Sequence, residues 1–416
     1  MAFTTYSLDD TPEGAPSERG KLEQALSCEL LSLVNSPHNT FDERSALDLG
    51  HATPQVQNLF GLELIGRLAV AHPHKNVLIS PLSVWSCGVW VQNGAAGATK
   101  AGLRRAFAMD GQTSDERWNV KVKHDSDVLR QQSGAEIRLA NGLWSEPGCA
   151  FDADFERLSE RYFGAAPSTL DFQQSEHAAQ TINSWIAAQT SGKIPLMVTA
   201  DNIASASVVL ANALYFKALW KNSFDPKRTQ LATFTAADGS QESGFMMGAK
   251  LKTACVETAS FQAVRLPYAD TSCALWAVLP AVGIAPLDAL KHWNQTDLSD
   301  QWEERIDLQL PRFTLDFSDD ITKHLGAMGA REAFQAGADF SKLGNAPLWI
   351  NAFLHKTRLE IDEKGTVAAA ATVVTMTKSA SRSTALTFNR PFALVLTEEK
   401  SRTPVFMGIV NTISQL

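Results

Sequence analysis

The sequence predicts an α+β fold, because helical patterns dominate early in the chain and strand patterns dominate late. Thr53 followed by Pro54 is a typical helix start, with a threonine cap before a first-turn proline. Residues 392–396 and 405–410 are apolar runs separated by a polar stretch, which predicts a β-hairpin. The helix predicted from Thr53 has apolar residues at helical spacing, at Val56, Phe60, Leu64 and Leu68.

The middle of the chain also shows helical patterns before strand patterns. A helix is predicted around 178–189, where it would bury Ile182, Trp185 and Ile186 and end before Ser191. Residues 208–216 are apolar almost throughout, which is typical of a strand covered on both faces. Further extended segments are predicted from Ile306 to Pro311 and over 348–361.

The chain is predicted to form one large domain, residues 53–416, preceded by an extension. Residues 1–52 are rich in Ser, Asp, Glu, Pro and Thr, so we interpret them as a loosely attached tail outside the core. An alternative is that part of the tail docks or binds a partner through one apolar helix face, formed by Leu22, Leu26, Leu30 and Leu33. No linker divides the rest.

Composition argues against several classes of partner. The formal net charge of −8 leaves no basic stripe to neutralise phosphates, so no nucleic-acid partner is expected. No run of about 18 apolar residues is present, so no membrane span is expected. The first ten residues lack a positive flank and an apolar stretch, which predicts a cytoplasmic protein without a secretory signal. Action outside the cell stays open, because some proteins leave cells without such a signal.

The cysteines predict neither a disulfide framework nor a zinc site. They are odd in number and far apart, with no Cys-x-x-Cys pair. A reducing compartment suits them, and we expect them to serve as small buried hydrophobic residues. The five are Cys28, Cys87, Cys149, Cys255 and Cys273.

The sequence offers almost no catalytic residues. It contains no Gly-x-Ser-x-Gly elbow and no His-Glu-x-x-His pattern. Residues 94–100 (GAAGATK) lack the Gly-Lys-Ser/Thr ending that holds phosphate. His72 and His74 flank Pro73 without acidic or cysteine neighbours in sequence, so we expect solvated side chains there. The chain is therefore not expected to be an enzyme or to need a cofactor.

One segment near the C-terminus has an unusual composition. Residues 365–386 (GTVAAAATVVTMTKSASRSTAL) are mostly small or β-branched and nearly uncharged, with no proline, and the part from 366 to 377 carries no charge. A flexible surface linker is one interpretation, but linkers are usually rich in Gly and Ser, whereas Thr and Val favour strands. As a strand, neither of its alternating faces would carry a charge that resists burial. The segment is therefore a plausible latent strand.

At this segment the sequence resembles the serpin family, and the similarity covers roughly residues 54–416. The run EKGTVAAAAT at 363–372 looks like the serpin hinge. The N-terminal extension and the ending at Asn411-Thr412, where the family usually has proline after asparagine, depart from the pattern. Other serpin-like segments are 76–83 (NVLISPLS), 139–144 (LANGLW), 182–185 (INSW), 190–194 (TSGKI), 210–217 (LANALYFK) with Trp220 and Phe224, 310–313 (LPRF), His355-Lys356, and 389–392 (NRPF).

The resemblance implies a fold of three β-sheets, about nine helices and an exposed reactive loop. It also implies a monomer that traps a target serine protease as a covalent acyl complex. It assigns Trp220 to the breach, where insertion of the loop begins, and four polar residues to the shutter beneath the sheet: Ser80, Ser83, Asn212 and His355. The hinge residues that it implies are Glu363, Gly365, Thr366, Ala368, Ala369, Ala370, Ala371 and Thr372.

The residues themselves support a polar cluster. A lone amide such as Asn212 in an apolar strand must find partners or cost about 1–3 kcal/mol. The alternative is that Asn212 and His355 are only satisfied core polar groups. A structural role and a switching role are compatible.

The reactive bond is predicted at Ser379–Ala380, from the usual serpin spacing after Glu363. Counting back from Phe388 places the cut after Ala380 instead, because the loop is one residue longer than is common. A small residue before the bond suits an elastase-like or subtilisin-like protease. Lys378 is the alternative, which would suit a trypsin-like protease. The competing function is a non-inhibitory serpin, a carrier or chaperone whose loop is cleaved as a substrate. The small residues of the hinge favour inhibition.

Overall fold

The computed structural model describes residues 53–109, 111–296, 302–365 and 384–414. In these ranges the chain forms nine α-helices, which agrees with the number expected. The predicted extension, residues 1–52, lies outside the described residues, so that boundary stays a prediction. The helices are α2 (Thr53–Ala71), α3 (Pro81–Asn93), α4 (Gly97–Ala106), α5 (Asp115–Arg130), α6 (Ala153–Leu158), α7 (Ser175–Gln189), α8 (Ala200–Ile203), α9 (Pro286–Gln295) and α10 (Thr322–Leu325).

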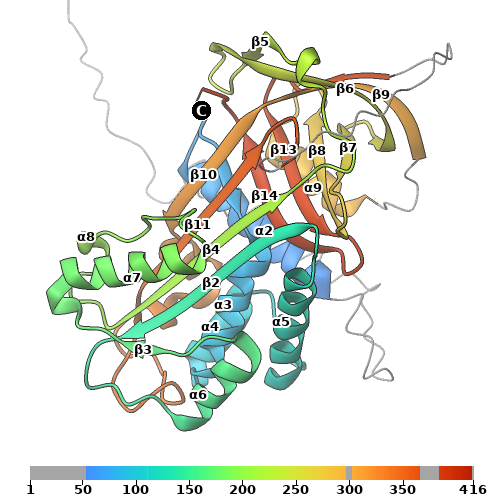
Figure 1. Ribbon diagram of the computed structural model, residues 1–416. Coiled ribbons are helices and arrows are strands. Elements are labelled where there is room, and N and C mark those ends of the chain that lie inside the picture. The colour runs from blue at the N-terminus through green and yellow to red at the C-terminus, as the bar shows by residue number, and fades with distance from the viewer. Residues whose placement is uncertain (1–52, 110, 297–301, 366–383, 415–416) are drawn as a thin grey trace, which may run out of the picture. The chain divides into compact units, whose positions relative to one another are not determined.

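The strands pair into two hydrogen-bonded sheets, so the α+β fold class is confirmed (Figure 1). The strands are β1 (Val77–Ile79), β2 (Ala135–Ser145), β3 (Ser168–Thr169), β4 (Val208–Ala218), β5 (Gln230–Thr235), β6 (Gln241–Glu257), β7 (Phe261–Pro267), β8 (Cys273–Pro280), β9 (Trp302–Pro311), β10 (Phe313–Asp320), β11 (Ile350–Ile361), β12 (Thr384–Thr387), β13 (Phe392–Glu398) and β14 (Thr403–Val410).

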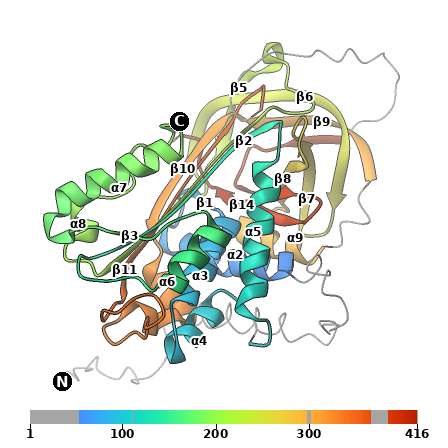
Figure 2. The same cartoon turned by 60° about the horizontal axis from the view of Figure 1, so that its bottom comes forward.

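The five-stranded sheet has the order β10-β11-β4-β2-β3. Its central strand, β4, is buried on both faces, as its nearly continuous apolar run predicts. Helix α7 packs on one face through Ala178, Ile182 and Ile186. Helix α3 lies against the other face, and Figure 2 shows the two helices on opposite sides of the sheet. The centre of this sheet is therefore closed to water.

The two middle strands of this sheet, β4 and β11, run parallel to each other. Their register extends from Ile350 opposite Val208 to Arg358 opposite Tyr215. On its outer edge β11 pairs antiparallel with β10, and β4 pairs antiparallel with β2. A strand entering between β4 and β11 could therefore run antiparallel to both.

The nine-stranded sheet has the order β1-β14-β13-β8-β7-β6-β9-β12, with β5 added to β6. Three sheets were expected, and two hydrogen-bonded sheets are present because β6 is 17 residues long. Its first part pairs with β5 and β9, and its last three residues pair with β7. One continuous strand thus joins what would otherwise be two separate sheets.

Several local predictions are confirmed. A helix begins at Thr53, another ends at Gln189, and β13 and β14 form the predicted hairpin. The four cysteines in the described part of the chain are buried and unpaired. Of the two histidines predicted to be solvated, His74 is exposed, whereas His72 is half-buried and its Nε2 lies 2.7 Å from Oδ2 of Asp319. Asp319 is 247 residues away, so sequence neighbours could not reveal it.

Candidate functional site

The four predicted shutter residues come together in space. Asn212 on β4 is the register partner of His355 on β11, so the two side chains meet where the parallel strands touch. Ser80 caps the N-terminus of α3, and Ser83 lies in its first turn. The side chains of all four have no exposed surface. We call Ser80, Ser83, Asn212 and His355 the shutter cluster.

Asn212 is the centre of the shutter cluster. Its Nδ2 donates to Oδ1 of Asn141 at 2.6 Å and also to Oγ of Ser83, while its Oδ1 lies 2.7 Å from Nδ1 of His355. Asn141 was missed as a site residue. Its position opposite Asn212 in the β2–β4 register explains the contact, but that register is not visible in the sequence. The amide is fully satisfied, which removes the cost of burying it.

The hydrogen bonds fix the protonation of His355. The backbone N–H of Ser80 donates to Nε2 of His355 at 3.2 Å, so this nitrogen must be an acceptor. The ring proton therefore sits on Nδ1 and is donated to Asn212. Burial lowers the pKa of His355 to about 3, although the bond to Asn212 opposes that shift. The imidazole is neutral at physiological pH.

Trp220 lies just after the C-terminal end of β4, away from the shutter cluster in the middle of that strand. Its ring stacks on Tyr268 with centroids 4.5 Å apart and meets the edge of Phe224. Its Nε1 donates to the carbonyl of Asp362 at 2.9 Å, and its backbone N–H donates to the carbonyl of Lys364. Trp220 therefore holds the chain where it leaves β11.

Gly365 fits a site that excludes a side chain. It forms a β-bridge with Leu219, and its φ of 149° is rarely adopted by other residues. A Cβ there would lie 2.3 Å from the carbonyl oxygen of Ala218. The carboxylate of Asp362 accepts from the backbone N–H groups of Lys364 and Gly365. The start of the predicted hinge is thus fixed by backbone contacts.

Glu363, the first predicted hinge residue, is also anchored. Its Oε1 accepts from Oγ1 of Thr229 at 2.8 Å and lies 3.8 Å from Nη1 of Arg312. The remaining hinge residues and the predicted reactive bond lie outside the described residues: Thr366, Ala368, Ala369, Ala370, Ala371, Thr372, Lys378, Ser379 and Ala380. Their roles stay predictions.

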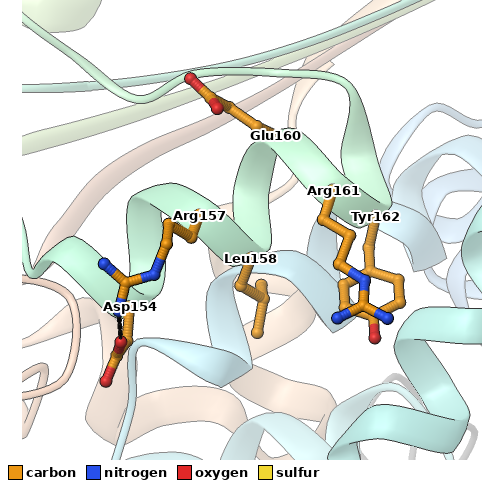
Figure 3. Close-up of a pocket in the computed structure, with 6 residues that line it drawn as sticks. All are labelled: Asp154, Arg157, Leu158, Glu160, Arg161 and Tyr162. Carbon is orange, nitrogen blue, oxygen red and sulfur yellow. Dashed lines mark hydrogen bonds and ion pairs between the residues drawn. The ribbon is translucent and has the colours of Figure 1, made fainter.

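A shallow hollow lies on α6 and the π-helix that continues it, Ser159–Phe163 (Figure 3). Asp154 and Arg157 form an ion pair on its rim, and the Arg161 guanidinium lies 4.9 Å from the Tyr162 ring centre. Among the lining side chains there is no serine, cysteine or histidine, so no nucleophile–base pair is present in it. The lining residues are Asp154, Arg157, Leu158, Glu160, Arg161 and Tyr162.

Comparison with known proteins agrees with this geometry. A family model described as serpin (serine protease inhibitor) matches residues 55–413. The chain belongs to the serpin family. Among curated serpins, neuroserpin from Homo sapiens is 26% identical over 387 residues, which cover 89% of this chain and 92% of the relative. Leukocyte elastase inhibitor from Equus caballus is 30% identical over 337 residues, which cover 76% of this chain and 87% of the relative.

Solved structures are also similar. Human thyroxine-binding globulin superposes with a TM-score of 0.79 at 25% identity, covering 86% of this serpin and 98% of that chain. The native state of the thermophilic serpin Tengpin superposes with a TM-score of 0.77 at 24% identity, covering 90% of this chain and 95% of that chain. At this identity the similarity supports the fold alone. The family consists mostly of protease inhibitors and not of enzymes.

Two further observations concern only the described residues. None of their helices combines the length and the apolar character needed to cross a membrane. Nowhere among them do three or more His, Cys, Asp or Glu side chains gather in a way that could hold a metal ion.

The buried neutral His355 predicts a pH dependence of stability. Because its folded pKa of about 3 lies below its ordinary value of 6.5, its contribution is complete above pH 6.5 and is lost as pH falls toward 3. Between pH 6 and pH 5, the free energy of urea unfolding should fall by about 1.2 kcal/mol less for His355→Gln than for the unsubstituted protein. His177→Gln, at an exposed position, is the control and should match the unsubstituted protein. The same change in unfolding free energy with pH in all three proteins would contradict the lowered pKa of His355.

The second prediction concerns Gly365. Replacing it with valine should force the backbone away from Ala218 and lower the free energy of unfolding by roughly 1–3 kcal/mol. The fluorescence of Trp220 should change as well, because its contact with this segment is disturbed. Gly111→Val is the matched control, since no atom lies within 4 Å of a Cβ built there. Similar melting temperatures for the two variants would show that the close approach is unimportant.

Proposed function

We propose that this serpin is a suicide-substrate inhibitor of serine proteases, in which the cleaved reactive loop enters the five-stranded sheet between β4 and β11. The observation that carries the proposal is that these two strands are parallel neighbours. The chain that follows β11 can fold back beside it and lie antiparallel to both strands, which is slightly the more stable pairing. Residues 366–377 carry no charge that opposes such burial.

The proposed reaction begins as ordinary acyl transfer. The protease serine attacks the carbonyl carbon of Ser379, the peptide bond to Ala380 breaks, and the new amino group takes the proton that the serine lost. An ester now joins the protease to Ser379. Hydrolysis of this ester would release the protease, so trapping must precede the arrival of water.

Insertion would supply the trap. Strand addition forms new ladder hydrogen bonds and buries small apolar side chains, so the released segment gains free energy in the sheet. The protease is carried along with the ester, and a displacement of about 1 Å in its catalytic groups can cost around 10²-fold in rate. The uncut form would then be held by a kinetic barrier.

The shutter cluster lies on that barrier. Adjacent strands in a sheet are about 4.8 Å apart, so a new strand between β4 and β11 would separate them by about another 4.8 Å. The 2.7 Å bond between Asn212 and His355 could not survive that separation. Insertion would therefore have to break this bond and satisfy both side chains again.

A non-inhibitory serpin is the second candidate. It is favoured by the similarity to thyroxine-binding globulin, whose solved structure holds thyroxine. The two functions differ on a denaturing gel after incubation with an elastase-like, a subtilisin-like and a trypsin-like protease. A covalent complex supports inhibition, and cleavage without a complex supports the second candidate.

The cleavage itself provides a prediction. A sample cut in the loop should melt several degrees higher than the intact protein, because the inserted strand adds hydrogen bonds and buried surface. Calorimetry of both samples measures the difference, and mass spectrometry of the released C-terminal peptide locates the cut. We expect a peptide beginning at Ala380, whereas one beginning at Ser379 would assign the bond to Lys378. Equal melting temperatures would refute insertion.

The hinge gives another prediction. Replacing Thr366 with arginine should convert the inhibitor into a substrate, because burying an unpaired guanidinium in the sheet costs far more than burying a hydroxyl. The measurement is the ratio of covalent complex to cleaved product on the gel. Thr366→Ser is the matched control and should retain the complex. Continued trapping by the arginine variant would mean that hinge insertion is the wrong mechanism.

A further inference from the structure

The segment that follows β14, residues 411–414, is held by the side chain of Asn76, which immediately precedes β1. Oδ1 of Asn76 accepts from the backbone N–H groups of Asn411 and Thr412 at 2.7 and 3.1 Å. Its Nδ2 donates to the carbonyl of Thr412 at 2.9 Å. The C-terminal segment is therefore fixed to the residue at which β1 begins.

Glu242 on β6 holds the same segment from another direction. Its Oε2 accepts from the backbone N–H groups of Ile413 and Ser414 at 2.7 and 3.0 Å, and its Oε1 accepts from the hydroxyls of Thr412 and Ser414. Burial alone would raise the pKa of Glu242, but these donors outweigh burial and lower it. The charged form of the carboxylate is thus the form that the segment binds. We call Asn76 and Glu242 the C-terminal clamp.

Thr412 connects the two halves of the clamp. It gives its backbone N–H to Asn76 and its hydroxyl to Glu242. The usual serpin proline at this position has neither an N–H nor a hydroxyl. The next residue, Ile413, is 3% exposed, and a Cβ built on Gly244 would lie 2.4 Å from its Cδ1. The clamp therefore depends on the residue at which this sequence departs from the family pattern.

β1 links the clamp to the shutter cluster. This strand has three residues, and β14 is its one neighbouring strand in the described part of the chain. Asn76 stands before β1 and Ser80 stands directly after it. The carbonyl of Leu78 accepts from Oγ1 of Thr357, and the backbone N–H of Ser80 donates to Nε2 of His355. One short strand thus has the clamp at its start and the shutter at its end.

We propose that the C-terminal clamp is a positioning device for the shutter cluster, because it fixes β1 and so keeps the N–H of Ser80 on His355. This inference rests on the proposed function, in which the shutter cluster lies on the barrier to insertion. A strand of three residues has few hydrogen bonds of its own, so the contacts at its ends decide how readily it shifts. Loss of the clamp should free Ser80 from His355 and shorten the lifetime of the uncut form.

Amide hydrogen exchange and NMR of the intact protein test the coupling. In Glu242→Gln a neutral amide replaces the carboxylate, so exchange at the N–H groups of Ile413 and Ser414 should become about tenfold faster. Exchange at the Ser80 N–H should rise with it. The ¹⁵N chemical shift of Nε2 of His355 should move toward that of an imidazole nitrogen without a hydrogen bond, a change that a clamp acting on the C-terminal segment alone would not produce.

Glu257→Gln is the matched control. Glu257 lies at the other end of β6, is exposed and accepts a hydrogen bond from Gln262, so this change should leave both signals as they are. A series at Thr412 gives the same comparison if Glu242→Gln does not fold. Thr412→Ser keeps both hydrogen bonds and should behave as the unsubstituted protein, Thr412→Val loses the hydroxyl, and Thr412→Pro loses the hydroxyl and the N–H. The two signals should change in that order.

The consequence for inhibition is measured separately. Intact proteins are incubated for increasing times at one temperature, and the covalent complex that each still forms with active protease is scored on a denaturing gel. The half-life of this capacity should fall about tenfold in Glu242→Gln, because the barrier that holds the uncut form is lowered. Glu257→Gln should keep the half-life of the unsubstituted protein.

Each result has a distinct meaning. Faster exchange at Ile413 and Ser414 without a change at Ser80 and His355 would overturn the coupling and leave the proposed function intact. Unchanged exchange in every clamp variant would overturn the clamp itself. Changes at Ser80 and His355, in a protein that forms no covalent complex even when unsubstituted, would support the clamp and overturn trapping.

Discussion

The contact between β4 and β11 is the constraint on which the rest of this structure depends. At its centre, the four shutter side chains have no exposed surface and are hydrogen-bonded to one another, to Asn141 and to backbone groups. The neutral imidazole of His355 bridges the two strands. Each buried polar group left unpaired costs about 1–3 kcal/mol, so the cluster is stable only as a whole. Separating the two strands would break these shared hydrogen bonds together.

The sequence predicts single helices and strands well, but it does not predict which distant residues and strands pair with each other. The helix that begins at Thr53 and the strand β4 were predicted from the spacing of apolar residues within one short stretch of sequence, so no distant partner was needed. The contact of Asn141 with Asn212 and the contact of Asp319 with His72 join residues 71 and 247 positions apart, which only the folded chain brings together. Two of the expected sheets form one sheet because β6 pairs with both β7 and β9. The composition of β6 does not reveal this pairing.

The candidate site was predicted mainly by resemblance, and physical reasoning now explains why those residue types stand there. Gly365 is required because the backbone of Ala218 leaves no space for a side chain. Trp220 is required because a broad ring with one N–H donor can cover Tyr268 and hold the carbonyl of Asp362 together. Asn212 is required because an amide both donates and accepts, as the shutter cluster demands.

The topology also explains why a cut would be needed before full insertion. The segment 366–383 starts at the end of β11 and leads to β12 in the other sheet. The segment joins β12 at Thr384, which pairs with Ile306 of β9, six residues before Arg312, and Arg312 contacts Glu363. Lying beside all 12 residues of β11 would carry the chain about 40 Å away. Returning to β12 would need about as many residues again, roughly 24 in all. With only 18 available, the uncut loop is too short to insert completely, and cleavage removes that limit.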